Sequence, residues 1–370
     1  AMKKTLIALA TLAAAGTAFA QSTATISGTI SAGIMDSGAA GDTAQVVSLG
    51  GGANAINIVT AEDLGGGMRA GFTGQIRFSA ASGDRTSGGN GNALFHDANV
   101  YLTNSMGTVR LGKIAEMSTC AFDPWGCAGG AAMMAGVGVG GDGRGLIGAR
   151  TIQNAISFAT PVINGFSATY QTSLSANPGV HNTATAGSQI IGRTNERTVL
   201  SLNYAKGPLS AQVLRTEGDR NDTTDRPSVG AVNAINQIAD TNGASAQGIS
   251  ASYNFGVARL NVSNIVTKTA TATANDINTI SASIPRGAMT FLVGYSKDKK
   301  ATATTDTKIA AGVNYALSKR TTIGADVFKA EATGITTGTI SGTAGAATLT
   351  SNTTAGNAGT GFVLRARHTF

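Results

Sequence analysis

Apolar and polar residues alternate with a period of two through most of this chain, and this pattern limits the fold more than any other feature. Near the C-terminus, Phe362, Leu364 and Phe370 share one parity. Arg365 and Arg367 share the other. A period of two over roughly 8–12 residues predicts strands with one apolar and one polar face. We expect sixteen strands, at residues 23–36, 54–63, 68–79, 94–103, 108–115, 150–161, 166–174, 196–206, 208–216, 245–255, 257–267, 275–284, 287–297, 305–317, 320–331 and 358–370.

The connections between the expected strands alternate in length. Short turns that contain Gly or Asn, such as Asn164-Gly165 and Lys206-Gly207, alternate with long polar loops. The long loops are expected at 80–93, 116–149, 175–195, 217–244 and 332–357. An even number of strands, with short turns at one end and long loops at the other, is typical of a transmembrane β-barrel of the outer membrane.

The composition favours a barrel in lipid over a soluble fold. Only 13% of the residues are charged and 5% are aromatic, whereas about a quarter of a soluble protein is charged. A β-sandwich must bury its apolar faces and protect its edge strands. A barrel in lipid turns its apolar face to hydrocarbon and pairs every edge. Aromatic residues near strand ends, on the outward parity, predict an interfacial girdle made of Tyr204, Tyr253, Phe255, Tyr295 and Tyr315.

Residues 1–20 have the features of a secretory signal peptide. A basic pair at 3–4 precedes an apolar stretch from Leu6 to Ala15, and Ala18-Phe19-Ala20 forms a small-x-small cleavage site. A membrane anchor would need an apolar run of about 20 residues. We therefore expect a mature chain of residues 21–370, a single barrel domain, whose net charge falls from +7 to +5 with the loss of two lysines.

Five segments resemble recurrent pieces of the general porins of β-proteobacteria and occur in the same order. They read EDLGGGM at 62–68, GTVRLGK at 107–113, GFSA at 165–168, LSKRT at 317–321 and RHTF at 367–370. The resemblance implies an all-β, 16-stranded antiparallel transmembrane β-barrel that forms a homotrimer among the lipids and lipopolysaccharide of a Gram-negative outer membrane. It also implies that the loop 116–149 folds inward as a constriction. The final Phe370 would be recognised by the barrel-assembly machinery.

The polar parity of the strands predicts which charged residues face the lumen. An Arg or Lys at mid-bilayer on the lipid face costs roughly 2–4 kcal/mol, so a one-residue slip in register is disfavoured. For any single Arg, the alternative is a structural ion pair with a lumen acid. The residues expected at the pore wall or constriction are Arg77, Asp97, Arg110, Lys113, Glu116, Asp123, Trp125, Arg150, Arg365 and Arg367.

Two departures from the family pattern limit the expected selectivity. The segment 54–58 reads Asn-Ala-Ile-Asn-Ile where related porins usually have an Arg, and His96-Asp97 stands where they tend to have a basic residue. Part of the basic lumen wall is therefore missing. A net charge of +5 fits a mild anion preference, although net charge does not determine the field inside a channel.

The loop 116–149 is rich in Gly, Ala, Val and Met. Phe122, Trp125, Met133 and Met134 would contact weakly polar or aromatic solutes, or would pack the loop against the inner wall. We favour packing, because it is the commoner use of apolar residues.

The same loop contains both cysteines of the chain, Cys120 and Cys127. In an exported protein this spacing predicts a disulfide in preference to two free thiols. A metal site would need His or further Cys nearby, and the loop has neither.

The sequence predicts a passive channel for small hydrophilic solutes and ions, without enzymatic activity, cofactor, metal or nucleic-acid partner. The three histidines, His96, His181 and His368, lie in different regions, and no nucleophile elbow or phosphate-binding loop is present. One alternative is a solute-specific channel with an apolar constriction. Another is a surface adhesin or β-solenoid, which would show a repeat of about 20–50 residues.

Overall fold

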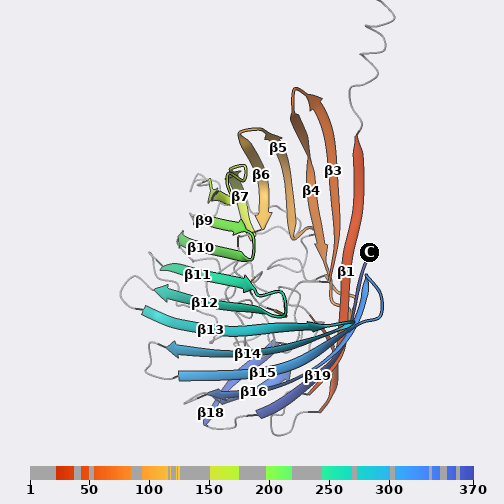
Figure 1. The fold of residues 1–370 in the computed structure, drawn as a ribbon, viewed down its shortest axis with the longest axis vertical. Coiled ribbons are helices and arrows are strands. Elements are labelled where there is room, and N and C mark those ends of the chain that lie inside the picture. Colours follow the sequence, from red (N-terminus) through yellow and green to blue (C-terminus); the bar gives the residue numbers. More distant parts are fainter. Residues whose placement is uncertain are drawn as a thin grey trace, which may run out of the picture.

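The computed structural model of this chain describes residues 22–36, 43–49, 54–85, 94–115, 117, 122, 124–125, 151–174, 197–218, 244–268, 273–300, 305–332, 336–341, 348–355 and 359–370. They form a closed antiparallel β-barrel (Figure 1). Within these residues there is no helix long and apolar enough to cross a membrane. The strands are β1 (Thr23–Asp36), β2 (Gln45–Ser48), β3 (Ala55–Gly65), β4 (Met68–Arg77), β5 (Asp97–Asn104), β6 (Gly107–Ala115), β7 (Thr151–Ala159), β8 (Phe166–Ser173), β9 (Arg197–Lys206), β10 (Leu209–Gly218), β11 (Ala244–Asn254), β12 (Arg259–Lys268), β13 (Thr273–Arg286), β14 (Met289–Lys300), β15 (Thr305–Ala316), β16 (Thr321–Ala332), β17 (Thr336–Ser341), β18 (Thr348–Ala355) and β19 (Gly359–Thr369).

The barrel closes where β19 pairs with β16 on one side and with β1 on the other. The C-terminal half of β1 pairs with β2 and its N-terminal half with β3, so β2 and β3 together form one barrel strand. The barrel therefore has sixteen strands, which confirms the number predicted from the alternation. Two strands that the sequence did not indicate, β17 and β18, form a separate hairpin within the expected loop 332–357. A closed barrel excludes the β-solenoid alternative.

Asn54 repairs the break between β2 and β3. Ser31 of β1 lies opposite this break and is paired in register with neither β2 nor β3, although the Leu49 N–H donates to the Ser31 carbonyl oxygen at 3.1 Å. The Asn54 side chain accepts a hydrogen bond from the Ser31 N–H at 2.5 Å and donates one to the Ser31 carbonyl oxygen at 3.0 Å. It also donates to the Ser48 hydroxyl at 2.6 Å. The carboxamide thus replaces a peptide group in the wall, where an unpaired N–H would be costly.

The outer wall is apolar. On β1, Ile26, Ile30 and Ile34 are exposed, whereas Met35 on the other parity is fully buried. Similar alternation is found on β5, where Val100 and Leu102 are exposed. This is the face that a barrel turns to lipid.

Four of the five aromatic residues expected in the girdle are exposed on the wall. They are Tyr253, Phe255, Tyr295 and Tyr315. The fifth, Tyr204, is half-buried, because its ring packs against Phe166 with centroids 4.6 Å apart.

The lumen face is not uniformly polar. One region of β6, β7 and β9–β13 forms an apolar cluster against which Met117 packs, made of Ile114, Ile152, Ala155, Val199, Leu214, Ala246, Ile265 and Ile277. Beside it runs a row of buried polar residues paired across neighbouring strands. Its members include Gln212, Ser250, Ser263 and Thr279.

The C-terminal residue fastens the barrel seam. Phe370 and Gly28 exchange two backbone hydrogen bonds, of 2.9 and 3.0 Å. The Phe370 ring covers Gly28 so closely that a Cβ on Gly28 would lie 2.4 Å from the ring. Only Gly fits beneath this ring.

Candidate functional site

The first part of the lumen wall lies on β3–β6, where the expected inward parity places Arg110 beside Asn99. Arg110 Nη1 donates hydrogen bonds to Asn99 Oδ1 at 3.2 Å and to Thr73 Oγ1 at 3.4 Å. Its guanidinium carbon lies 5.3 Å from the centroid of the Tyr101 ring, within the range of a cation–π contact. The Tyr101 hydroxyl is held in turn by the carbonyl oxygen of Thr60 at 2.9 Å. These contacts hold the Arg110 side chain along the wall.

Arg77 and Asp97 occupy the next level of the same wall. Asn57, Gln75 and Asp97 lie opposite one another on β3, β4 and β5. Gln75 Nε2 donates to Asn57 Oδ1 at 2.8 Å and Gln75 Oε1 accepts from Arg77 Nε at 2.5 Å. Asp97 is half-buried and accepts from Asn99 Nδ2 at 2.6 Å. The segment 54–58 thus contributes a neutral amide, Asn57, to this row.

Lys113 has the outward parity of β6, which it shares with the exposed Val109 and Leu111. The register between β6 and β7 shifts because β7 has one extra residue between Ile152 and Ala155. Ile152 therefore joins Ile114, which keeps the inward parity of Arg110, in the apolar lumen cluster. Lys113 is half-buried, and its Nζ donates to the carbonyl oxygen of Phe95 at 3.3 Å. The structure therefore holds Lys113 against the chain that precedes β5, on the opposite parity from Arg110.

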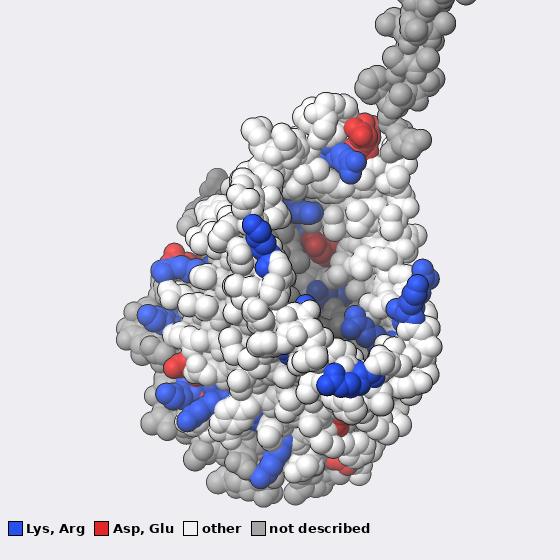
Figure 2. Space-filling model, in the orientation of Figure 1, with Lys and Arg blue, Asp and Glu red and all other residues white. Residues whose placement is uncertain are grey.

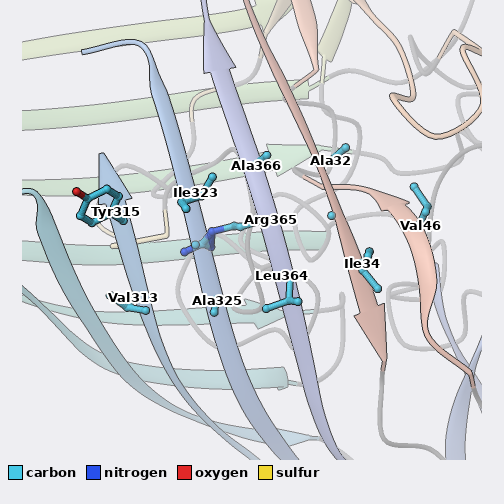
Figure 3. A pocket seen from close by; sticks show the side chains of 12 residues that line it. Ala32, Ile34, Val46, Val313, Tyr315, Ile323, Ala325, Leu364, Arg365 and Ala366 are labelled. Atoms are coloured by element: carbon cyan, nitrogen blue, oxygen red, sulfur yellow. The ribbon is translucent and has the colours of Figure 1, made fainter. Parts of the chain in front are cut away.

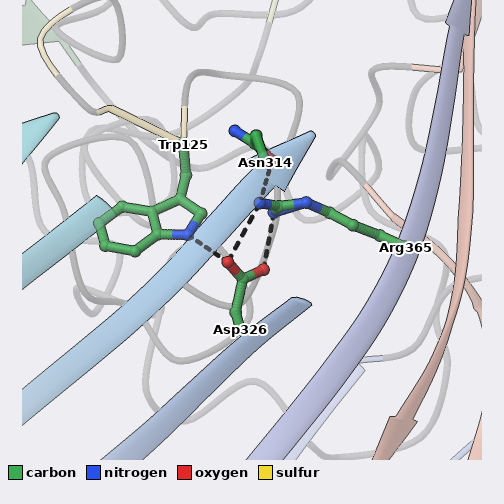
Figure 4. A network of polar contacts seen from close by, with 4 residues as sticks. All are labelled: Trp125, Asn314, Asp326 and Arg365. Atoms are coloured by element: carbon green, nitrogen blue, oxygen red, sulfur yellow. Dashed lines mark hydrogen bonds and ion pairs between the residues drawn. The ribbon is translucent and has the colours of Figure 1, made fainter. Parts of the chain in front are cut away.

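A second polar centre lies on β15, β16 and β19 (Figure 4). Arg365 Nη1 donates to Asp326 Oδ2 at 2.6 Å, and Nη2 donates to Asp326 Oδ1 at 3.1 Å and to Asn314 Oδ1 at 2.5 Å. The indole Nε1 of Trp125 donates to Asp326 Oδ1 at 3.0 Å. The side chains of Asp326 and Arg365 are only 0% and 8% exposed. Arg365 is thus an ion-paired residue of the wall.

The other expected site residues are in part described by the structure. Arg367 is exposed on β19. Phe122 and Trp125 are buried. Arg150, Glu116, Asp123, Cys120 and Cys127 lie outside the described residues.

Sequence reasoning missed Asp326. It lies within an expected strand on the lumen parity, and a carboxylate at that depth needs a cationic partner. Its position in the strand could therefore have indicated an ion pair. No feature of the sequence indicated the contact with Trp125, which is 201 positions away.

The space-filling view shows where these charges gather. The face in Figure 2 is hollowed, and Lys and Arg side chains lie around and within the hollow, with a smaller acidic area between them. The described lumen wall therefore has charged groups in reach of a solute.

A groove of about 620 Å³ lies outside the barrel, on β1, β2, β15, β16 and β19 (Figure 3). Ile34, Val46, Tyr315 and Leu364 line it, and all four are exposed on the outer wall. Its position on the lipid face separates it from the path of a solute.

Comparison with known proteins identifies the family. The sequence model of the Gram-negative porins matches residues 5–334. The chain is 30% identical over 338 residues to outer membrane porin protein 32 of Delftia acidovorans, covering 87% of this chain and 88% of that protein.

Solved structures share the fold. The anion-selective porin of Comamonas acidovorans has a TM-score of 0.68 at 22% identity, covering 95% of this chain and 100% of that one. OmpT of Vibrio cholerae, in a trimer form, has a TM-score of 0.64 at 13% identity, covering 94% and 99%. With a family match over most of its sequence and a closed sixteen-stranded barrel, this chain belongs to the Gram-negative porins and forms a passive diffusion channel across the bacterial outer membrane.

Proposed function

We propose that this porin passes small hydrophilic solutes and ions with a mild preference for anions. The observation that carries the proposal is the wall of β4–β6, where Arg69, Arg77 and Arg110 on the inward parity accompany a single acid, Asp97. Three positive charges and one negative charge leave +2 on this wall. Arg365 adds nothing to this sum, because Asp326 cancels its charge.

The physical basis is the field inside a narrow polar lumen. Charges lining a pore act on a passing ion where little water screens them. The neutral Asn57 and the acidic Asp97 reduce the positive field, so the preference is mild. The Comamonas acidovorans relative, named as anion-selective, supports the same sign.

Ion selectivity tests the proposal directly. The refolded protein is placed in a planar bilayer under a tenfold KCl gradient, and the reversal potential is measured. We expect a chloride-favouring value for the wild type and a smaller one for the double variant Arg77→Gln/Arg110→Gln. Arg215→Gln, which removes an exposed Arg paired with Glu217, is the matched control and should leave the potential unchanged. A cation-favouring wild type would contradict the anion preference, and the absence of ohmic conductance would contradict the channel.

We propose a homotrimer as the functional assembly, supported by the family and by the trimer form of the Vibrio cholerae relative. Light scattering of the protein in detergent should give three times the protomer mass. Single insertions into a bilayer should close in three equal steps. A monomer mass with single-step closure would contradict the trimer.

We propose that the chain is exported, cleaved after Ala20, and recognised through Phe370 by the barrel-assembly machinery. N-terminal sequencing of protein from the outer membrane should begin at Gln21. The mature barrel would sit among outer-membrane lipids and lipopolysaccharide, and it would act without a catalytic step. A retained N-terminus would contradict the cleavage.

We also propose that Cys120 and Cys127 form a disulfide, as their spacing in an exported chain predicts. Protein from the outer membrane should gain no mass on alkylation before reduction. After reduction it should gain two alkyl groups. Alkylation without reduction would contradict the disulfide.

A further inference from the structure

We propose that Trp125 fixes the chain between β6 and β7 to the lumen wall, and that Asp326 beneath it cancels the charge of Arg365. The four residues Trp125, Asn314, Asp326 and Arg365, here called the Trp125 network, would then determine both the width and the charge of the pore. This inference rests on the channel function and deepens it. It assigns a positioning role to Trp125 and a selectivity role to Asp326.

The first support is the hydrogen bond between two distant parts of the chain. Trp125 precedes β7, and Asp326 lies on β16, yet the indole N–H donates to the carboxylate at 3.0 Å. Figure 4 shows the indole nitrogen and the Arg365 guanidinium meeting the same carboxylate. A buried indole N–H needs a partner, and Trp125 is only 5% exposed. The contact therefore fixes the position of Trp125 and also gives its buried indole N–H a hydrogen-bond acceptor.

The second support is an apolar socket around the indole. Trp125 packs in a buried cluster with residues of β1, β2, β14, β15, β16 and β19. The other members are Met35, Val47, Leu49, Leu292, Ala310, Phe328 and Val363. Apolar side chains on a wall that faces a water-filled lumen are stable only when they are covered. Trp125 provides such cover.

The third support is the pair of glycines beneath the network. Gly312 lies opposite Asp326, and Gly324 lies opposite Arg365. A Cβ on Gly312 would be 1.9 Å from Asp326 Oδ1, and a Cβ on Gly324 would be 2.7 Å from Arg365 Nε. Neither glycine has a positive φ. Space for the polar side chains, and not backbone conformation, therefore explains why these two positions are glycine.

The network separates two effects that mutation can test independently. Trp125→Phe retains an aromatic ring in the socket but removes the donor. Asp326→Asn retains an oxygen that can accept from Trp125 but removes the negative charge, so Arg365 acquires an uncompensated positive charge. Trp125→Phe should loosen the attachment of residue 125 to the wall. Asp326→Asn should make the electrostatic potential in the lumen more positive.

Single-channel recording tests the tether. In Trp125→Phe, residue 125 loses its hydrogen bond to the Asp326 carboxylate. We therefore expect the equilibrium between channels with residue 125 held at the wall and channels with it released to shift about tenfold toward release. Open-channel current noise should rise and the mean conductance should change. Tyr295→Phe, which removes a hydroxyl from an exposed aromatic on the outer wall, is the matched control and should behave as wild type. A Trp125→Phe channel with wild-type noise and conductance would overturn the positioning role.

Reversal potentials test the charge. For Asp326→Asn we expect the chloride-to-potassium permeability ratio to rise roughly twofold, because one uncancelled positive charge on the wall, screened in part by salt, attracts chloride and repels potassium. Asp276→Asn, a neutralisation on the outward parity of β13, should leave the ratio unchanged. If Asp326→Asn does not fold because Arg365 is left unpaired, Asp326→Asn/Arg365→Gln removes both charges and should restore the wild-type ratio. An unchanged ratio in Asp326→Asn, or a changed ratio in the double variant, would overturn the selectivity role.

The channel function and the Trp125 network can be contradicted separately. A wild-type protein without ohmic conductance would contradict the channel function. A conducting wild type with Trp125→Phe and Asp326→Asn channels indistinguishable from it would contradict the Trp125 network alone.

Discussion

At the scale of single residues, the barrel depends on side chains that replace backbone partners. Asn54 is the clearest case, because its carboxamide forms hydrogen bonds with both the N–H and the carbonyl oxygen of Ser31 at the break between β2 and β3. The Ser31 carbonyl oxygen also accepts from the Leu49 N–H at 3.1 Å. The Ser31 N–H donates to Asn54 Oδ1. The energetic weight of Asn54 therefore rests mainly on this one N–H.

Replacing Asn54 by Ala should lower the free energy of unfolding by about 1–3 kcal/mol, the cost of leaving a buried donor unpaired. Urea unfolding in detergent, followed by the fluorescence of the single Trp, measures it. Asn57→Ala is the matched control, because it removes a half-buried side chain that accepts one hydrogen bond from Gln75. Equal losses in the two variants would show that Asn54 is not a substitute for the backbone.

At the scale of elements, the seam between β1 and β19 depends on a glycine beneath an aromatic ring. Gly28→Val should lower the free energy of unfolding by at least about 1–3 kcal/mol, because the new side chain would overlap the Phe370 ring and the Ala55 carbonyl oxygen. Ala24→Val adds similar bulk on the same parity of β1, where Ala24 is exposed, and should be tolerated. Heat-modified migration on gels reports the folded fraction of each variant. A stable Gly28→Val barrel would mean that the ring can leave the seam at little cost.

The elements also show how far sequence reasoning reached. Alternation predicted the sixteen strands and predicts one face of the sheet for Arg110 and Asp97, because lipid on one side and water on the other enforce a period of two. It did not predict the register shift between β6 and β7, because the extra residue on β7 interrupts the period of two. It did not find Asp326 beneath Trp125, because this contact joins positions 201 apart and depends on the closed shape of the barrel.

At the scale of the whole molecule, the proposed selectivity is the effect of a local field and not of the net charge, which is +7 for the full chain. In this proposal the charges that count are those of Arg69, Arg77 and Arg110, while the charge of Arg365 is cancelled by Asp326. A field of this kind is screened by salt, with a Debye length of about 10 Å at 0.1 M and about 3 Å at 1 M.

The chloride-to-potassium permeability ratio should therefore fall toward one as the mean KCl concentration rises from 0.1 to 1 M, at a constant concentration ratio across the bilayer. Arg77→Gln/Arg110→Gln should have a smaller ratio and a weaker salt dependence, because less positive charge is left to screen. A ratio that is the same at both concentrations would mean that anions are selected by direct contact in a narrow passage, and the field of the lumen wall would no longer explain the preference.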